Sequence, residues 1–255
     1  MTISNDLVFH VVIPARYAST RLPAKMLADI AAKPMIQHVY ERACQSGAAS
    51  VVIATDDERI LSEVDKFTAQ VCMTSPNHQT GTDRIAEVLT QHSYGEQDII
   101  VNVQGDEPLI SAKDILQVAS DLAATSDIVM ASLCERITDE SVIANPNVVK
   151  VVRDQQNRAL YFSRAPLPWD QKHFPRRYPS NLHFRHMGLY AARAGFIKDF
   201  VTWERSPLEE IESLEQLRVQ WYGHKILVNE AKVGGCISVD TPADLERVRD
   251  KLQAK

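Results

Sequence analysis

The chain has 255 residues, of which 45% are hydrophobic and 24% charged, and it carries a formal net charge of -5 at pH 7. A chain of this length and composition buries one sizeable core and folds as a soluble globular protein, which excludes a disordered chain. The acidic balance disfavours nucleic acids and anionic membrane surfaces as partners, because both are polyanions.

Neither a membrane span nor a secretory leader is expected. No apolar run approaches the roughly 20 residues that a membrane helix needs, and no basic region precedes the first apolar run. The four cysteines are widely spaced, form no CxxC pair and lie mostly in apolar stretches: Cys44, Cys72, Cys134 and Cys236. We expect buried, free thiols in a reducing compartment, which predicts a cytoplasmic location.

In the first half of the chain, short runs rich in Val and Ile alternate with stretches of helical periodicity. Strands are expected at residues 9–16, 50–57, 70–74 and 98–106, and helices at 34–46, 57–67, 83–92 and 112–125. The almost wholly apolar strands at 9–14 and 99–103 are typical of the centre of a sheet covered on both faces. This order predicts a mostly parallel α/β sheet.

After residue 128 the pattern changes to strand pairs, followed by a helix, a strand and a closing helix. Strands are expected at 130–137, 147–154, 158–164, 184–193 and 225–231, a surface excursion at 169–183, and helices at 206–223 and 241–252. The first of these helices begins with Ser206 as N-cap and Pro207. Its glutamates are expected on a solvated face: Glu209, Glu210, Glu212 and Glu215. We therefore expect one domain over residues 1–255, with a smaller strand-rich lobe at about 128–200.

A basic loop, residues 14–25, follows the first predicted strand. It carries three cations, Arg16, Arg21 and Lys25, and two hydroxyls, one of them on Ser19. Open α/β sheets bind ligands at this edge, and Arg and Lys side chains suit phosphate groups. Because the loop contains neither GxGxxG nor GxxxxGK[ST], side chains would do more of the phosphate binding than backbone amides. A solvated basic surface loop is the alternative.

Two aspartates follow short apolar runs elsewhere in the chain. Asp106 comes after the buried 98–106 strand, and Asp240 comes after a run that we interpret as a further strand. A carboxylate beside a triphosphate is a natural Mg²⁺ ligand, because this ion takes one or two protein carboxylates and fills its other positions with phosphate and water. Each aspartate could instead cap the helix or turn that follows it. Together with the basic loop, the two predict a magnesium site.

Other segments carry polar groups suited to a nucleotide or an anionic substrate. Thr80 and Arg84 lie at the start of a predicted helix, whose free amides can hold a base or a phosphate, although an ordinary helix cap is an equal alternative. Arg164 and the Arg185–His186 pair could contact an anion, and buried salt bridges would explain them as well. No HExxH or CxxC accompanies His183 and His186, so a zinc site is not expected.

Seven segments together resemble the 3-deoxy-manno-octulosonate cytidylyltransferase family. They are IPARYASTRLPAK, GTDRIAEV, VNVQGDEP, ALYFSRAPLPW, FRHMGLYAARAGF, SPLEEIESLEQLRV and VDTPADLERV. The resemblance runs from about residue 9 to residue 252. Single motifs, the first above all, are shared with other sugar nucleotidyltransferases, whereas the ordered set is specific.

This resemblance implies a Rossmann-like fold, a homodimer, a requirement for CTP and Mg²⁺, and transfer of CMP to the octulosonate for lipopolysaccharide synthesis. It places Arg16, Arg21 and Lys25 on the CTP phosphates, Arg84 near the nucleotide, and Asp106 and Asp240 on the metal. With Ser19 and Thr80 these form the expected nucleotide site, in which Arg16, Lys25 and Asp106 are catalytic. The sugar site would be lined by Gln104, Arg164, His186, Tyr190, Glu215 and Gln216.

Two positions depart from the family pattern. Ala24 stands where the family usually has Gly, and the segment VGGCIS before VDTP replaces a commoner version that contains Pro-Gly. The first affects the backbone of the basic loop, and the second affects the approach to Asp240. Neither removes a charged group.

Several other functions remain as alternatives. The acceptor could be a sialic acid or the 8-amino analogue of the octulosonate, or the chain could be a glycosyltransferase that releases no pyrophosphate. An NAD-dependent oxidoreductase is disfavoured by the missing glycine motif, and covalent acyl chemistry by the missing GxSxG. A catalytically silent nucleotide-binding protein is the alternative from a different class.

Overall fold

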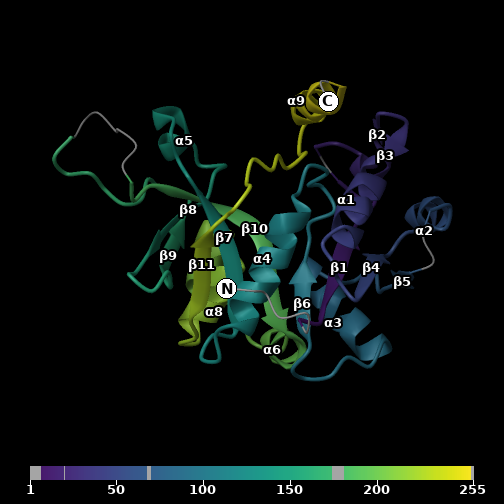
Figure 1. The fold of residues 1–255 in the computed structure, drawn as a ribbon, viewed down its shortest axis with the longest axis horizontal. Helices are drawn as coiled ribbons and strands as arrows, with labels where there is room; N and C mark the ends of the chain where they lie inside the picture. The colour runs from purple at the N-terminus through teal and green to yellow at the C-terminus, as the bar shows by residue number, and fades with distance from the viewer. Residues whose placement is uncertain (1–6, 20, 68–69, 174–180, 254–255) are drawn as a thin grey trace.

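The computed structural model, which describes residues 7–19, 21–67, 70–173 and 181–253, is built on one mixed sheet (Figure 1). Its strand order is β11-β7-β10-β6-β1-β4-β5. The strands are β1 (Phe9–Ala15), β4 (Ser50–Thr55), β5 (Val71–Met73), β6 (Ile99–Asn102), β7 (Met130–Arg136), β10 (Phe184–Arg193) and β11 (Ile226–Glu230). The predicted parallel pairing is confirmed for β1 with β4 and β6 and for β4 with β5, whereas β10 is antiparallel to both β6 and β7.

Helices pack on both faces of this sheet and form two hydrophobic cores. On one face lie α1 (Met35–Cys44), α2 (Glu58–Val64), α4 (Ala112–Ala123) and α9 (Pro242–Gln253); on the other lie α3 (Gly81–Gln91), α6 (Ala194–Phe200), α7 (Pro207–Glu212) and α8 (Gln216–Trp221). Neighbouring residues of β1 serve different cores, because successive side chains of a strand point to opposite faces: Val11 and Ile13 join the first, Val12 the second. The prediction of a doubly covered central strand is confirmed.

The remaining elements are short. They are the 3-10 helix η1 (Lys25–Leu27), the pair β2 (Asp29–Ile30) and β3 (Lys33–Pro34), helix α5 (Glu140–Ala144), and the strands β8 (Lys150–Arg153) and β9 (Ala159–Ser163). The strands β8 and β9 form an antiparallel pair on β10, whereas β7 and β10 lie within the main sheet. Separation of residues 128–200 into a lobe stays a prediction. Part of the expected 169–183 excursion, residues 174–180, lies outside the described residues.

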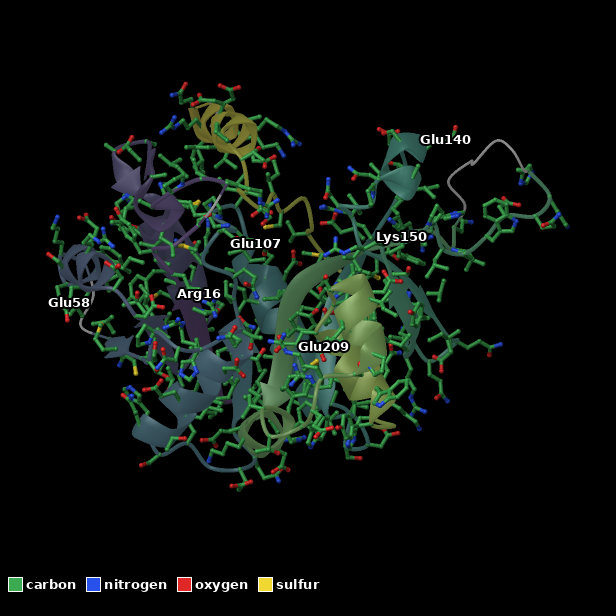
Figure 2. All side chains as sticks on the ribbon, turned by 180° about the vertical axis from the view of Figure 1, so that it is seen from behind. Arg16, Glu58, Glu107, Glu140, Lys150 and Glu209 are labelled. Atoms are coloured by element: carbon green, nitrogen blue, oxygen red, sulfur yellow. The ribbon has the colours of Figure 1, made fainter. Side chains whose placement is uncertain are left out.

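The prediction of one long helix over 206–223 was wrong, because the chain breaks between α7 and α8 at Ser213, whose φ is 52°. An ion pair spans the break: the Arg218 guanidinium donates to both carboxylate oxygens of Glu209, at 2.7 and 2.6 Å. Glu209 is therefore buried (Figure 2), and Glu212 accepts a hydrogen bond from Ser163 at 2.5 Å. The expectation of a solvated face was therefore wrong for Glu209, whereas Glu210 is exposed and Glu212 and Glu215 are half-buried.

All four cysteines are free, and three of them are buried as expected, whereas Cys44 is exposed at the end of α1. None of the described helices combines the length and the hydropathy that crossing a bilayer requires.

A fully buried lysine fastens β8 to the segments on either side of it. The Lys150 ammonium donates to the carbonyl oxygens of Asn145, Val148 and Arg164, at 2.9, 2.6 and 2.5 Å (Figure 2). These three bonds satisfy all three N–H donors of the ammonium. Burial, together with the nearby charge of Arg164, lowers the pKa of Lys150. Lys150 thus holds the backbone of Arg164, a predicted sugar-site residue, in place.

We predict that Lys150→Met lowers the free energy of unfolding by about 3 kcal/mol or more, because three buried carbonyls lose their donor. Urea unfolding followed by circular dichroism would measure this loss. Lys225, which is exposed and forms no hydrogen bond or ion pair within the described residues, provides the matched control: Lys225→Met should change stability by less than about 0.5 kcal/mol. Equal midpoints for the two variants would contradict the structural role of Lys150.

Candidate active site

A cavity of 340 Å³, here called the basic cavity, lies where the loop after β1 meets three other segments. It is lined by Pro14, Arg16, Ala18, Ser19, Arg21, Lys25, Met26, Gly81, Gln104, Asp106 and Asp240. Six of the eight residues predicted for the nucleotide and the metal are among them. The structure therefore brings the basic loop and both aspartates together, as the sequence predicted.

Lys25 is the centre of this cavity. Its ammonium donates to Asp106 Oδ2 at 2.6 Å, to Asp240 Oδ1 at 3.1 Å and to the carbonyl oxygen of Val239 at 3.3 Å, and Arg21 reaches Asp240 at 2.9 Å. Burial alone would lower the pKa of Lys25, whose side chain is 11% exposed, but the two carboxylates outweigh burial and raise it. Lys25 therefore stays charged and neutralises a pair of carboxylates.

The two carboxylates have the chemistry of a magnesium site. Asp106 and Asp240 are close enough for one ammonium to bridge them, and Mg²⁺ accepts a protein contribution of one or two carboxylates. Among residues 7–19, 21–67, 70–173 and 181–253 no group of three or more His, Cys, Asp or Glu side chains is arranged to hold a metal. The pair fits an ion that takes its other ligands from phosphate and water.

Asp106 reaches Lys25 because the turn after β6 packs tightly against the end of β1. A Cβ atom on Gly105 would lie 3.0 Å from both the Pro14 carbonyl oxygen and Met26 Sδ. Real Cβ atoms are rarely this close to other atoms, so a larger residue would push the turn away. The glycine of the QGD motif thus sets the distance between the carboxylate and the basic loop.

Asp240 does not follow a strand, contrary to our prediction. It ends an irregular segment, residues 231–240, which we call the strap and which is held largely by side chains. Both oxygens of the fully buried Asp114 accept strap N–H groups, from Val233 at 3.0 Å and from Gly234 at 2.8 Å. Gly234 has a φ of 65°, a left-handed conformation that favours glycine.

The end of the strap is tied to the active site itself. The Gly235 amide donates to Glu135, and the Arg185 guanidinium, paired with Glu135, donates to the Cys236 carbonyl oxygen at 3.3 Å. The backbone N–H of Val239 then donates to the Asp106 carbonyl oxygen at 2.9 Å. The segments that carry Asp106 and Asp240 are therefore hydrogen-bonded to each other. The VGGCIS segment places Asp240 at the site without forming a regular strand.

A second cavity, of 510 Å³, lies against β10 and is called the β10 cavity. Five of the six predicted sugar-site residues line it: Gln104, Arg164, His186, Tyr190 and Gln216. Gln104 also lines the basic cavity, so the two cavities are neighbours. This arrangement can hold two substrates side by side.

The sixth predicted sugar residue, Glu215, lies in a smaller inner cavity of 190 Å³. This cavity shares Gln104 with both others and shares Tyr190 and Gln216 with the β10 cavity. Thr82 Oγ1 donates to Glu215 Oε2 at 2.7 Å. Burial raises the pKa of Glu215. The predicted sugar residues thus form one continuous surface.

The β10 cavity combines cations with an uncharged imidazole. Burial lowers the pKa of His186 to about 3, so this ring is neutral near pH 7, and its Nε2 lies 2.9 Å from Ser132 Oγ. The Arg164 guanidinium donates to the carbonyl oxygens of Glu212 at 2.7 Å and Pro146 at 3.0 Å. Permanent charge for an anionic ligand therefore comes from arginine and not from His186.

Sequence reasoning missed several residues of these cavities. Thr82, Glu107, Cys236 and Ser238 also line them, and Arg185, noted only as suited to an anion, does so as well. Burial, followed by the charge of Asp106, raises the pKa of Glu107 to about 7. The position of Glu107 beside Asp106 was an available signal, whereas nothing in the sequence placed Cys236 opposite it.

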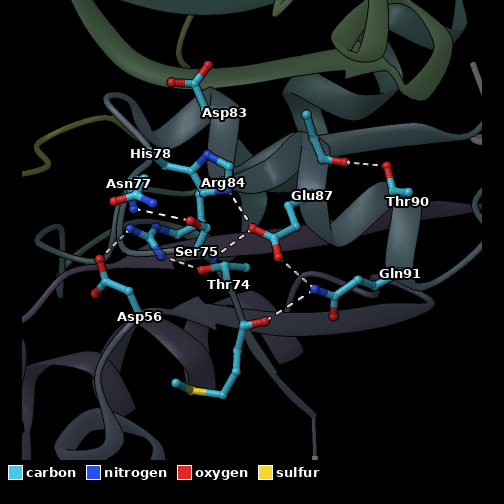
Figure 3. Close-up of polar contacts among 12 residues, drawn as sticks. Asp56, Thr74, Ser75, Asn77, His78, Asp83, Arg84, Glu87, Thr90 and Gln91 are labelled. Carbon is cyan, nitrogen blue, oxygen red and sulfur yellow. Dashed lines mark hydrogen bonds and ion pairs between the residues drawn. The ribbon is translucent and has the colours of Figure 1, made fainter.

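Arg84, which the sequence placed near the nucleotide, does not line the basic cavity. It is fully buried, donates to Thr74 and forms a 2.6 Å ion pair with Asp56 (Figure 3). Thr80 is the N-cap of α3 in a capping box with Asp83, and its neighbour Gly81 lines the cavity instead. Thr80 is therefore an ordinary helix cap, the alternative that the sequence left open.

The segment that precedes α3 holds the Arg16 side chain in place. The Arg16 guanidinium donates to the carbonyl oxygen of His78 at 2.8 Å, and the His78 ring lies 2.5 Å from Glu87 (Figure 3). Glu87 also accepts the Ser75 amide at 2.8 Å and the Gln91 side chain at 2.9 Å. Helix α3 therefore anchors the loop that orients Arg16.

Ala24, the first departure from the family pattern, has φ 55° and ψ 27°, a left-handed conformation. Its carbonyl oxygen accepts the Leu27 amide at 2.9 Å, so this residue begins the 3-10 turn that carries Lys25. A left-handed L-residue is strained by about 1–2 kcal/mol. The Ala in this position is therefore under strain where a Gly would not be.

Comparisons with known proteins agree with this geometry. Residues 10–226 match the family model described as cytidylyltransferase. The chain is 57% identical over 249 residues to the 3-deoxy-manno-octulosonate cytidylyltransferase of Vibrio vulnificus (strain CMCP6), covering 97% of this chain and 99% of that protein. It is 52% identical over 255 residues to the enzyme of the same name from Pasteurella multocida (strain Pm70), covering 96% and 98%.

Solved structures give the same result. A structure of CMP:2-keto-3-deoxy-manno-octonic acid synthetase complexed with CTP superposes with a TM-score of 0.88 at 40% identity, covering 97% of this chain and 98% of that chain. The 4-diphosphocytidyl-2C-methyl-D-erythritol synthase of Anaerococcus prevotii DSM 20548, at 12% identity and a TM-score of 0.63, shares the fold. The expected Rossmann-like nucleotidyltransferase fold is confirmed.

We predict that Ala24→Gly raises the free energy of unfolding by about 0.5–1 kcal/mol, because the relief of left-handed strain exceeds the entropy that glycine adds to the unfolded chain. Urea unfolding would measure the change. Ala123, the exposed last residue of α4, is the control: it is not left-handed, so Ala123→Gly relieves no strain and should lower stability slightly. Changes of the same sign in the two variants would contradict strain at Ala24.

Proposed function

The chain belongs to the 3-deoxy-manno-octulosonate cytidylyltransferases, and from this premise we propose that it transfers CMP from CTP to 3-deoxy-manno-octulosonate and releases pyrophosphate. The observation that carries the proposal is the Lys25 ammonium bridging Asp106 and Asp240, at 2.6 and 3.1 Å, inside a cavity that also holds Arg16 and Arg21. This cavity shares Gln104 with a second cavity large enough for a sugar. A nucleotide and an acceptor would therefore meet at Gln104.

The triphosphate of CTP would occupy the basic cavity. Arg16, Arg21 and Lys25 supply charge-assisted hydrogen bonds to phosphate oxygens, Ser19 supplies a hydroxyl, and Gly81 presents the start of α3 to the cavity. Thr80 would act by capping that helix end. These groups already occupy their positions in the folded chain, so little rearrangement of the protein is needed to stabilise charge on the phosphates.

The metal would be Mg²⁺, held by Asp106 and Asp240. Their separation and the hard carboxylate oxygens support this assignment. Bound there, Mg²⁺ would neutralise phosphate charge and lower the pKa of an attacking hydroxyl. Lys25 keeps the two like charges together in advance.

In the proposed reaction the C2 hydroxyl oxygen of the sugar attacks the α-phosphorus of CTP. A new P–O bond forms, the bond from the α-phosphorus to the oxygen bridging to the β-phosphate breaks, and pyrophosphate leaves on the opposite side. The proton of the hydroxyl passes to water. The protein supplies no nucleophile; Lys25 and Arg16 stabilise charge on the phosphates, and positioning accounts for the rest of the rate.

The acceptor would occupy the β10 and inner cavities. Arg164 faces the sugar carboxylate as a permanent cation, and the neutral His186 offers a hydrogen bond without competing for that role. Tyr190, Glu215 and Gln216 offer hydrogen-bonding groups to sugar hydroxyls. An acidic polyhydroxy sugar matches this mixture of arginine charge and hydrogen-bonding groups.

We also propose that the enzyme works in the cytoplasm as a homodimer and supplies lipopolysaccharide synthesis. Exposed apolar side chains on neighbouring elements support a dimer face: Leu160 on β9, Ile211 on α7 and Trp221 on α8 are 62%, 82% and 54% exposed. Hydrogen bonds join β9 to both helices, from Gln220 to Ala159 and from Ser163 to Glu212. Such a cluster suits burial against a second copy.

A pyrophosphate-release assay tests the function. CTP would be incubated with 3-deoxy-manno-octulosonate, a sialic acid or the 8-amino analogue, each with and without Mg²⁺. Magnesium-dependent release with the octulosonate is the expected result. Release only with another sugar would overturn the acceptor, transfer without pyrophosphate would indicate a glycosyltransferase, and CTP binding without turnover would indicate a silent nucleotide-binding protein.

We predict that Asp106→Asn lowers turnover by roughly 10²–10⁴-fold, because the neutral amide weakens metal binding and charge stabilisation. The same assay at increasing Mg²⁺ would measure the loss, with circular dichroism to check folding. Asp250→Asn is the matched control, since Asp250 is exposed on α9 away from the cavity lining. Near-normal turnover of the Asp106 variant would remove this residue from the site.

We predict that Ile211→Lys converts the dimer to a monomer, because a charge in the centre of an apolar interface is buried without a partner. Analytical ultracentrifugation at matched concentrations would report the mass. The control is Val8→Lys, at a residue 61% exposed just before β1. A dimer that persists in the Ile211 variant would place the interface on another face.

A further inference from the structure

A fourth cavity, of 630 Å³, lies among α1, α4, α9 and the strap. It shares no lining residue with the basic, β10 or inner cavities. We call it the α4 cavity, because Ser111, Ala112 and Lys113 at the start of α4 line it. Nothing in the proposed reaction uses it.

Its charge is entirely positive. Arg42 from α1, Lys113 from α4 and Lys251 from α9 line the cavity, and no acidic residue does. Within the described parts of the chain, none of these three side chains forms a hydrogen bond or an ion pair, so their charge is available to a ligand. The α4 cavity is thus a local region of positive charge in a chain whose net charge is -5.

The size and lining of the cavity also suit a small anionic molecule. The start of α4 lines the cavity, but the buried Asp114 carboxylate in its first turn already accepts the Val233 and Gly234 amides, so the positive charge comes from the three side chains. Leu109 and Val233 add apolar surface beside the cations. A volume of 630 Å³ exceeds the size of a single phosphate ion and is in the range of pockets for small molecules of about 300–1,000 Å³.

We propose that the α4 cavity binds a small phosphate-bearing molecule, held by Arg42, Lys113 and Lys251. The binding itself does not depend on the proposed function. The phosphate would pair with the three cations, and the apolar rim would contact the remainder of the molecule.

The position of this site couples it to the metal site, and only this coupling rests on the proposed function. Val233, Gly234 and Gly235 of the strap line the cavity, and Asp240 follows five residues later. Residues 109–113, which also line the cavity, follow Asp106 closely in the chain. A ligand in the cavity would thus contact both segments that carry the metal-binding carboxylates and bias their separation.

Titration with inorganic pyrophosphate, followed by the backbone amide signals of ¹⁵N-labelled protein, tests the binding. We expect saturable shifts of Gly234 and Gly235 in addition to shifts of Gly81 and Gly105 at the basic cavity. Lys113→Gln combined with Lys251→Gln should weaken the first set about tenfold or more, since two charge-assisted contacts are lost, and leave the second set unchanged. The control, Lys225→Gln with Arg205→Gln, removes two exposed unpaired cations elsewhere and should behave as wild type.

Absent shifts at Gly234 and Gly235, or shifts that persist in the Lys113 and Lys251 variant, would overturn the site. For the coupling, inorganic phosphate should change the Mg²⁺ concentration for half-maximal turnover about fivefold or more in wild type and not in that variant. An equal effect on both proteins would overturn the coupling. Failure of the proposed function would show separately, as no pyrophosphate release without added phosphate.

Discussion

One ammonium group, that of Lys25, joins three parts of the chain that are far apart in sequence. It contacts Asp106 after β6, Asp240 at the end of the strap and the Val239 carbonyl oxygen. Two carboxylates in one place repel each other, and the shared cation converts that repulsion into attraction to a common centre. Because all three donors of the ammonium are used, the arrangement is specific in direction as well as charge. The basic loop, the central sheet and the C-terminal segment consequently meet at one point in the wall of the basic cavity.

The strap shows how the chain reaches this point without regular structure. An irregular backbone has no helix or sheet partners for its polar groups, and side chains supply them here: Asp114 accepts two strap amides, and Glu135 accepts a third. Glycines make the path possible, since Gly234 and Gly235 both have positive φ. The VGGCIS segment therefore replaces a strand by a set of anchored positions. Its departure from the family pattern alters the route to Asp240 while leaving the carboxylate in contact with Lys25.

The sequence predicted those parts of the site that lie in segments following a strand. The apolar runs of β1 and β6 identified two neighbours at the centre of the sheet, so sheet geometry brings the basic loop after β1 and Asp106 after β6 to the same edge. The turn at Ala24 then directs Lys25 toward the carboxylate. The prediction failed where a contact depends on a partner outside the same helix or strand. Helix periodicity continues through Ser213, yet the chain breaks there, because Glu209 and Arg218 pair across the turn. Arg84 was placed near the nucleotide, but its charge pairs with Asp56, 28 positions away in the sequence. Spacing along one element carries no information on such pairs.

The distribution of charge explains how an acidic protein can bind two anionic substrates. The carboxylates of the basic cavity are already neutralised by Lys25 and Arg21, so they add little repulsion toward a triphosphate. In the β10 cavity the imidazole of His186 is kept neutral by burial, which leaves recognition of a carboxylate to Arg164 and Arg185. Backbone carbonyls and Glu135 hold these guanidinium groups, so their charge is fixed in position before a ligand arrives. A fixed cation costs less to bring to an anion than a mobile one, because its side-chain entropy has been lost on folding. The net charge of the chain thus says little about the site. The ion pairs and hydrogen bonds of the individual side chains decide which anions the cavities attract.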